Sequence, residues 1–413
     1  MTELLDAREK RQEILKGIIL DLHAGKDPAE LKERLSRLIR QVSPSEIAEM
    51  EDRLIAEGMP PEEVKRLCDV HVAVMKDALA QQDKAAREKP DLVPGHPVHT
   101  FRLENRAIQK VVDSMREMLD QLRRNGQPDW EGNRQAIKSQ LELLSEIEKH
   151  YRRKENQLFP LLEKHGIYGP PKVMWGVHDD IREQLKEVTR AVEEGEVEKV
   201  IHRGERLLTA VSDMIYKEEN ILFPLSLETL SEEDWGEVRA GEEEIGYALV
   251  SPGTQWQPPA VEPPAVDEGI RGEERDIPPA TLHLDTGELT VEQVNLVLTH
   301  LPVDITFVDE QDRVRYYSAG THRVFPRSPA IIGRKVQNCH PYNSVHVVNR
   351  IIEDFKQGTK SEAEFWLGMD GRFVHIRYFA VRDRDGRYRG ILEVTQDVTD
   401  IRALQGEKRL LDW

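Results

Sequence analysis

The chain carries two near-identical stretches, ENQLFP at residues 155–160 and ENILFP at residues 219–224. Histidine also precedes glutamate by five residues at three places, which are His99 and Glu104, His150 and Glu155, and His178 and Glu183. Imidazole and carboxylate side chains that project inward from several helices of one bundle hold iron or manganese pairs in proteins. The pattern therefore predicts a metal centre inside a helical bundle.

Helix-end signals divide residues 91–245 into long helices. Breaks fall at the Asn-Gly-Gln-Pro of residues 125–128, at Gly166 and at Gly195. Short connections between long helices favour antiparallel neighbours. We therefore expect an antiparallel four-helix bundle, capped by a short acidic helix that begins after Ser231.

The flanking regions have different compositions. Within residues 1–90, helix-capping residues stand directly before prolines, and glycines stand where helices should end. These signals predict a small helical domain. Residues 246–280 contain three Pro-Pro pairs among acidic residues and predict a linker. In residues 281–413 the period of the hydrophobic pattern changes from that of helices to that of strands. This change predicts an α+β domain with a five-stranded antiparallel sheet. Its expected elements are strands at 304–309, 314–317, 361–367, 373–381 and 390–395, and a helix at 343–357.

Composition excludes several classes of protein. The net charge of −18 argues against nucleic acid or an anionic membrane as a partner. The two cysteines, Cys68 and Cys339, lie far apart and fit a reducing cytoplasm better than a disulfide scaffold. The first residues lack the pattern of a signal peptide, and no apolar run approaches the ~20 residues of a membrane span. We therefore expect a cytoplasmic protein of mainly α class.

Residues 92–230 resemble the hemerythrin-like HHE cation-binding domain. The resemblance implies a non-haem di-iron centre in which Glu155 and Glu219 bridge the ions and histidines are terminal ligands. The residues that carry it, besides the two Leu-Phe-Pro endings, are His99, His150, Glu155, His178 and Glu219. One departure is Met214, which stands five residues before Glu219 where the family usually supplies histidine. The ligand that this histidine would supply has other candidates, which are Glu104, Glu183, Glu218 and Tyr216. Otherwise that ligand position stays open.

Two further resemblances flank the bundle. Residues 42–47, 57–60 and 67–71 are similar to a domain of unknown function that often precedes hemerythrin-like modules. Residues 301–309 and 393–399 are similar to the opening and closing strands of a PAS domain. The order of the three matches strengthens each of them.

The metal hypothesis has an alternative. Residues five apart lie about 140° apart around a helix, so they serve two ions about 3.5–4 Å apart better than one. The alternative is a buried polar network without metal, in which glutamates need cations of some other kind. Mixed imidazole and carboxylate favours iron or manganese over zinc, and the family resemblance selects iron.

A second candidate site lies in the PAS-like region. Cys339 and His340 fall where such a domain shapes its pocket, and His346 follows in the next helix. A PAS-domain cofactor, such as haem, or a redox thiol is one hypothesis, and a structural turn with a buried cysteine is the other.

These observations lead to a functional hypothesis. We expect a cytoplasmic sensor rather than a catalyst, in which the iron centre responds to O2, nitric oxide or redox state and the PAS domain relays the change to an unidentified protein partner. A homodimer formed through the PAS domain or its final helix is a further expectation. The alternatives are a di-iron protein of iron–sulfur cluster repair or iron handling, and a metal-free interaction scaffold.

Overall fold

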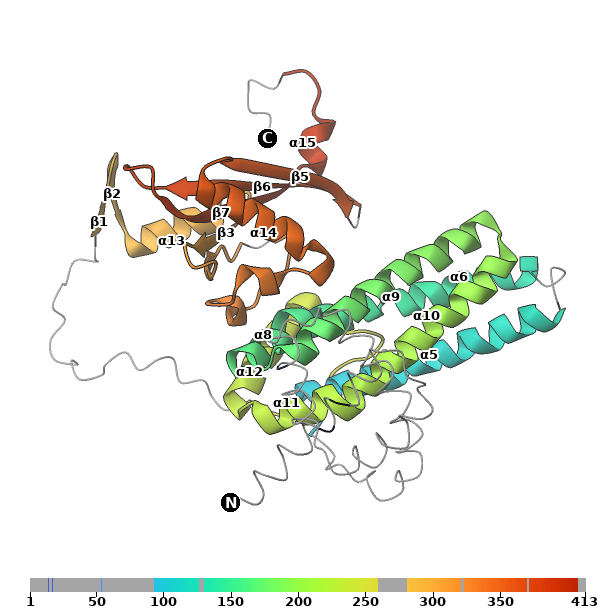
Figure 1. Cartoon of the computed structure of the whole chain (residues 1–413). Helices are drawn as coiled ribbons and strands as arrows, with labels where there is room; N and C mark the ends of the chain where they lie inside the picture. The colour runs from blue at the N-terminus through green and yellow to red at the C-terminus, as the bar shows by residue number, and fades with distance from the viewer. Residues whose placement is uncertain are drawn as a thin grey trace, which may run out of the picture. The chain divides into compact units, whose positions relative to one another are not determined.

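The structure is a computed structural model of the 413-residue chain (Figure 1). It describes residues 93–125, 130–258, 281–320, 323–369 and 371–407, together with Ile14, Gly17 and Arg53. The chain divides into two compact units, Met1–Val261 and Glu262–Trp413. The helical domain predicted for residues 1–90, with Cys68, and most of the predicted linker lie outside the described residues.

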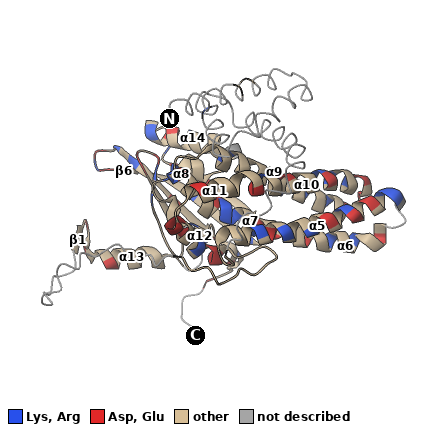
Figure 2. Ribbon diagram, turned by 90° about the horizontal axis from the view of Figure 1, so that it is seen from below, with Lys and Arg blue, Asp and Glu red and all other residues tan. Residues whose placement is uncertain are grey.

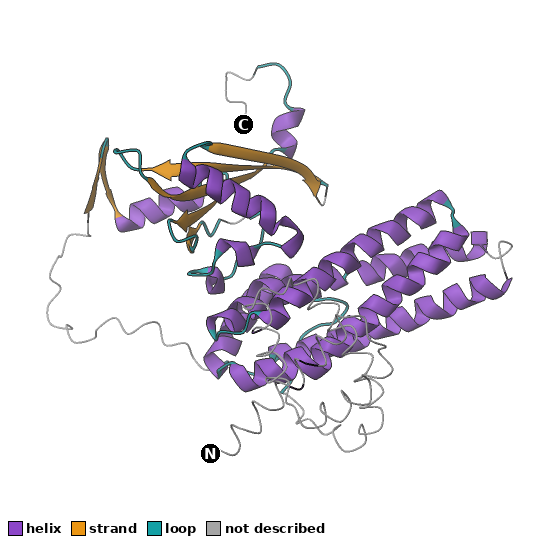
Figure 3. Cartoon of the chain, in the orientation of Figure 1, coloured by secondary structure: helices purple, strands orange, loops and turns teal. Residues whose placement is uncertain are grey.

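The first unit contains a helical bundle (Figure 3). Its long helices pack in a ring in which α5 contacts α6, α6 contacts α9, α9 contacts α10, and α10 returns to α5. Their bounds are α5 Pro97–Asn125, α6 Trp130–Ser145, α9 Gly169–Glu194 and α10 Val197–Lys217. The helical bundle predicted from the sequence is confirmed.

The repeated Leu-Phe-Pro stretches widen two helices. The chain that begins with α6 continues through α7 (Ile147–Arg153), the π-helical turn η2 (Lys154–Leu158) and α8 (Phe159–Lys164). Pro160 follows this turn, and proline has no N–H and its ring crowds the carbonyl four residues earlier, so the helix cannot keep its regular spacing there. Such π-turns occur frequently at functional sites.

The second repeat has the same effect on the last long helix. There α10 continues through the π-helical turn η3 (Glu218–Leu222) into α11 (Phe223–Thr229), with Pro224 at the same place. A short helix, α12 (Glu232–Ile245), follows and starts at a capping box between Ser231 and Asp234. It contacts α7, η2 and α5 and closes one end of the bundle.

The bundle helices are amphipathic. On α5 the buried residues Ile108, Val112 and Leu119 follow helical spacing and face the interior. Acidic and basic residues both occur along the bundle helices (Figure 2). Arg123 of α5, for example, pairs with Glu205 of α10.

The second unit contains an antiparallel sheet with strand order β4-β3-β7-β6-β5 among its described residues. The strands are β3 Asp304–Asp309, β4 Val314–Tyr317, β5 Glu362–Met369, β6 Arg372–Arg382 and β7 Tyr388–Asp397. The helix α14 (Tyr342–Gln357) and the short 3-10 turns η5 (Pro329–Ile331) and η6 (Val336–Cys339) lie between β4 and β5 in sequence. The predicted five-stranded sheet and its helix are confirmed.

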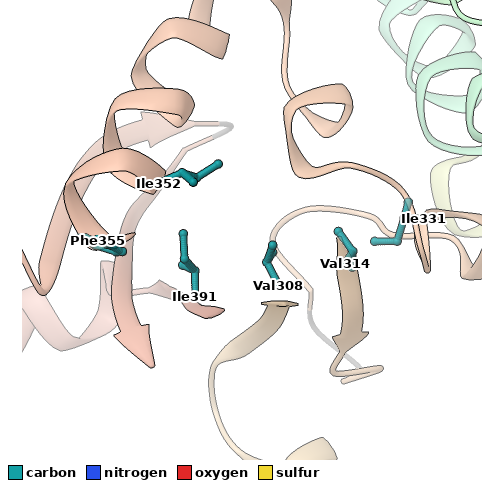
Figure 4. Close-up of a cluster of buried hydrophobic side chains, with 6 residues drawn as sticks. All are labelled: Val308, Val314, Ile331, Ile352, Phe355 and Ile391. Atoms are coloured by element: carbon teal, nitrogen blue, oxygen red, sulfur yellow. The ribbon is translucent and has the colours of Figure 1, made fainter. Parts of the chain in front are cut away.

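Side chains from the sheet and α14 form the core of this unit (Figure 4). Ile352 and Phe355 of α14 lie against Val308 of β3 and Ile391 of β7. Val314 of β4 and Ile331 of η5 complete the cluster. The helix therefore covers one face of the sheet.

A hairpin and two further helices complete the second unit. The hairpin pairs β1 (Thr281–Leu284) with β2 (Gly287–Thr290) and leads into α13 (Val291–His300), while α15 (Thr399–Ala403) follows β7. Thr290 caps α13 through a capping box with Gln293. Neither the hairpin nor α13 was predicted from the sequence. Such short strands are weak signals because an isolated hairpin has little stability of its own.

Candidate functional site

His150 lies at the centre of a buried polar network in the bundle. Its Nδ1 is 2.8 Å from Glu104 Oε2, and its Nε2 is 2.9 Å from Glu218 Oε2. All three residues are fully buried. A carboxylate oxygen only accepts hydrogen bonds, so both nitrogens of His150 carry hydrogen when both glutamates are ionised. The imidazole is then a cation held between two carboxylates from α5 and η3.

Two buried basic residues lie beside His150. Arg153 donates from one guanidinium nitrogen to Glu104 and from the other to Glu242 Oε1 at 3.0 Å. Lys154 donates from Nζ to Glu218. Both side chains are 0% exposed. Buried lysine and arginine are rare in proteins unless they are paired, and here each has a carboxylate partner.

The network continues to α9 through His178. The ring lies between Glu155 and Lys154, with Nδ1 2.7 Å from Glu155 Oε1 and Nε2 3.2 Å from Lys154 Nζ. Because Lys154 only donates, Nε2 accepts and Nδ1 carries the hydrogen. Tyr151 stacks on the His178 ring with centroids 3.9 Å apart, and Arg182 donates to Glu155 Oε2 at 2.9 Å.

The segment after α12 closes the network. Glu104 Oε1 accepts from the backbone N–H of Ala248 at 2.6 Å. The ring of Tyr247 lies against the Arg153 guanidinium, 4.7 Å from its centroid. Glu242 Oε2 accepts from Arg239 at 3.2 Å. These contacts connect the bundle interior to the chain that leaves it.

The pKa values reflect this burial and pairing. Burial raises the pKa of Glu155 to about 7, although Arg182 opposes the shift. For Glu218 burial acts in the same direction, but Lys154 and His150 outweigh it and lower the pKa to about 2. Burial and then Lys154 hold the pKa of His178 well below its usual value, so the ring is neutral, as its hydrogen bonds require. Burial also lowers the pKa of Lys154, and Glu218 opposes that shift.

The chemistry of the donor set does not fit a pair of metal ions. Metal ligation uses the lone pair of a neutral imidazole nitrogen. Both nitrogens of His150 bond to carboxylates, and the Nε2 lone pair of His178 is taken by Lys154. Among the described residues, no group of three or more His, Cys, Asp and Glu side chains is arranged to hold a metal ion.

The structure brings together one part of the predicted ligand set. The residues that meet in the network are Glu104, His150, Glu155, His178 and Glu218. Glu219 lies outside it and accepts hydrogen bonds from Arg102 and Asn105 at 3.2 Å. Glu183 is 65% exposed and lies 3.8 Å from Lys186. His99 is half-buried in the first turn of α5.

Two other positions of interest have structural contacts. His96 Nδ1 accepts the N–H of Val98 at 3.1 Å, which caps the start of α5, and its ring packs against Trp235 and Trp256. Burial lowers the pKa of His96 to about 4, with smaller contributions from nearby positive charges. Met214 is fully buried on α10.

The second unit contains a cavity of about 250 Å³ between α14 and the sheet. Most of its lining is aliphatic, including Val308, Val348, Ile352 and Ile391. Its polar lining residues include His340, Ser344, Tyr378 and Glu393. A mostly apolar cavity with a few polar groups is typical of sites for small molecules.

The polar part of this cavity is partly buried. Tyr378 of β6 lies opposite Glu393 of β7 in the sheet register. Burial, and then Glu393, raises the pKa of Tyr378, so its phenol stays protonated. Burial lowers the pKa of His340, although Glu393 opposes the shift, and its ring is neutral at physiological pH. Glu393 is 8% exposed and lies 4.0 Å from Arg327.

The three residues proposed for this region from the sequence have separate positions. His340 lines the cavity. Cys339 packs beside the core cluster, and its Sγ lies 3.7 Å from the Lys335 carbonyl oxygen. His346 is exposed on α14. The structure therefore does not bring them together at one site.

Comparison with known families gives three matches along the chain. Residues 15–81 match a family of unknown function (DUF438), residues 96–226 match the hemerythrin HHE cation binding domain, and residues 294–399 match a PAS domain. The chain therefore carries, in order, regions that match DUF438, hemerythrin HHE and PAS. The three resemblances inferred from the sequence are confirmed. HHE and PAS domains together point to a metal-binding signalling or sensor protein.

Solved structures match part of the chain. A C-terminal domain from Streptococcus mutans is 36% identical, with a TM-score of 0.30, and the match covers 30% of this chain and 98% of that one. The PAS domain of a Colwellia psychrerythraea protein is 18% identical, with a TM-score of 0.22 and coverages of 26% and 97%. A sensor histidine kinase from Vibrio cholerae is 14% identical, with a TM-score of 0.21 and coverages of 26% and 90%. No curated protein matches the chain.

Sequence reasoning missed the basic half of the HHE network. Arg153 and Lys154 stand three and four residues after His150, which places all three on one helix face. That spacing was a usable signal. No comparable signal exists for Glu242, because its position depends on how α12 docks on the bundle.

In the described part of the chain no helix is long and apolar enough to cross a membrane.

Proposed function

We propose that this protein is a sensor whose PAS domain binds a small, largely apolar ligand and signals its presence to a protein partner. The observation that carries the proposal is the cavity of about 250 Å³ between α14 and the sheet. Binding pockets for drug-sized ligands span about 300–1,000 Å³. The PAS cavity therefore suits a molecule smaller than most drugs.

The polar lining defines the chemistry of the ligand. Glu393 offers a buried carboxylate, Tyr378 a protonated phenol and His340 a neutral imidazole. Glu393 Oε1 accepts a hydrogen bond from Thr395 at 3.3 Å, and a carboxylate can accept several. A ligand that carries an N–H or O–H group therefore adds a further bond to Glu393. An apolar body of one or two rings with a single donor fits this description, and indole is a suitable probe.

Filling the cavity is expected to abolish binding. Val348→Phe adds a ring at a lining position of α14, and we expect the affinity for indole to fall at least tenfold, or about 1.4 kcal/mol. Isothermal titration with the purified full chain measures this affinity. Asn349→Phe adds the same ring at the next, exposed position of α14 and is the matched control. Equal affinity in the two variants would place the ligand elsewhere.

The carboxylate is expected to select for a donor. In Glu393→Gln the buried acceptor loses its charge, and a hydrogen bond to a charged group contributes about 1.5–3 kcal/mol. We therefore expect indole to bind more weakly, by roughly ten- to a hundredfold, while naphthalene, which has no donor, binds the variant and the parent alike. A parallel loss of both probes would indicate that the substitution perturbs the cavity rather than a bond to the ligand.

The narrower sensing hypotheses concern the HHE domain. A non-haem di-iron centre that responds to O2, nitric oxide or redox state stays a prediction, as do cluster repair and haem in the PAS domain. The hydrogen bonds of His150 and His178 argue against the di-iron centre, because they occupy the lone pairs that metal ions need. Elemental analysis and an absorption spectrum of anaerobically purified protein test all of these hypotheses that need metal.

A further inference from the structure

We infer that Lys154 and Arg153 take the place of metal ions in the HHE bundle, so that the chain itself neutralises its buried carboxylates. This inference concerns the first unit and is independent of the ligand proposed for the PAS domain. It rests on the contacts, burial and charge of the network around His150.

The first step is the position of the Lys154 ammonium. Its Nζ bonds to Glu218 from η3 and to the Nε2 of His178 from α9. A carboxylate and an imidazole from two helices are the donor types that would hold an iron ion. The ammonium occupies their lone pairs and supplies a positive charge. It also lies 4.6 Å from the centroid of the Tyr151 ring, which adds a cation–π contact.

The second step is the position of the Arg153 guanidinium. It bridges Glu104 of α5 and Glu242 of α12, two fully buried carboxylates that belong to different helices. Aromatic rings of Phe101 and Tyr247 lie at 4.6 and 4.7 Å from it. A metal ion in a dinuclear site likewise binds carboxylates from more than one helix. Here one planar cation does so.

The third step is the balance of charge. Among the described residues of the network, the fully buried acids are Glu104, Glu218 and Glu242, and the fully buried bases are Arg153, Lys154, His150 and the neutral His178. Each of these acids lies within hydrogen-bond distance of Arg153, Lys154 or His150, so the interior supplies its own positive charge. At the edge Glu155 is paired with Arg182. Metal ions added to this interior would meet buried cations at short range, which is strongly unfavourable in a medium of low dielectric constant.

The intact protein provides the first test. The full chain is produced in iron-supplemented cells, analysed for metal and melted with and without EDTA. We expect well below one metal ion per chain and the same melting temperature in both conditions. Stoichiometric metal, with a fall in melting temperature when EDTA removes it, would overturn the inference.

A substitution at Lys154 provides the second test. Lys154→Glu replaces the ammonium with a metal ligand beside Glu218 and His178. We expect Co2+ to raise the melting temperature of the EDTA-treated variant by about 5 °C or more and to produce a visible cobalt spectrum, whereas the parent shows neither response.

Lys149→Glu is the matched control, because it makes the same change at a partly exposed position of α7. It should behave as the parent. A parent chain that responds to Co2+ as strongly as Lys154→Glu would contradict the inference. If Lys154→Glu does not fold, the absence of a Co2+ response in the parent still supports the inference, and its presence still refutes it.

Discussion

Arg153→Met is expected to lower the free energy of unfolding of the bundle by about 3 kcal/mol, the lower end of the 3–5 kcal/mol that follows removal of one partner from a buried ion pair. Methionine fills much of the same space, so the loss comes from charge rather than from a cavity. Glu104 keeps His150 and the Ala248 N–H as partners, which limits the effect. Glu242 has a pKa of about 7, raised by burial and lowered in part by Arg153, so it takes up a proton when the guanidinium is lost.

Urea unfolding of the full chain, followed by far-ultraviolet circular dichroism, measures this effect because the bundle supplies much of the described helix. Arg152→Met is the matched control. Arg152 is the preceding residue, its side chain is 28% exposed, and its carboxylate neighbour Glu148 is 3.9 Å away. A pair of this kind contributes about 0–1 kcal/mol. Similar losses in the two variants would show that Arg153 is not the cation on which the bundle interior depends.

The sequence predicts the helices and strands well because their signals are local. Glycine and proline breaks mark the ends of α5 and α9, and β3 and β4 were expected at the bounds that the structure has. The repeat around Pro160 and Pro224 also indicated a shared interior site. It did not indicate that each repeat starts inside a π-turn, because that widening depends on how proline alters the hydrogen bonds of the preceding turn.

The composition of the site was harder to predict. His150 and His178 were predicted as metal ligands together with Glu219. In the structure they lie in one network with glutamates, but the glutamate of α10 and η3 that enters it is Glu218 and not its neighbour Glu219. Neighbouring residues on a helix point about 100° apart. The sequence motif does not determine which of the two glutamates points into the bundle. Charged residues are normally exposed, so Lys154 inside the bundle contradicts the usual expectation and is visible only once its partners from other helices are known.

Gly390→Ala is expected to destabilise the PAS domain by about 3 kcal/mol or more. Gly390 of β7 has φ of +140°, a region that costs other residues roughly 1–3 kcal/mol. A Cβ there would also lie 2.1 Å from the carbonyl oxygen of Val308 and 3.0 Å from the ring of Phe307. Both atoms belong to β3, the strand that pairs with β7. The sheet must therefore separate at this point, and overpacking of this kind costs about 1–3 kcal/mol more.

Hydrogen–deuterium exchange of residues 388–397 in the full chain measures the loss, because amides of a destabilised strand exchange faster. Gly386→Ala is the control. Gly386 also has a positive φ, +80°, but a Cβ there meets nothing within 4 Å, so only the backbone cost of about 1–2 kcal/mol applies. Equal exchange in the two variants would mean that β3 and β7 separate at little cost. Since Val308 and Ile391 line the cavity from these two strands, Gly390→Ala should also weaken indole binding.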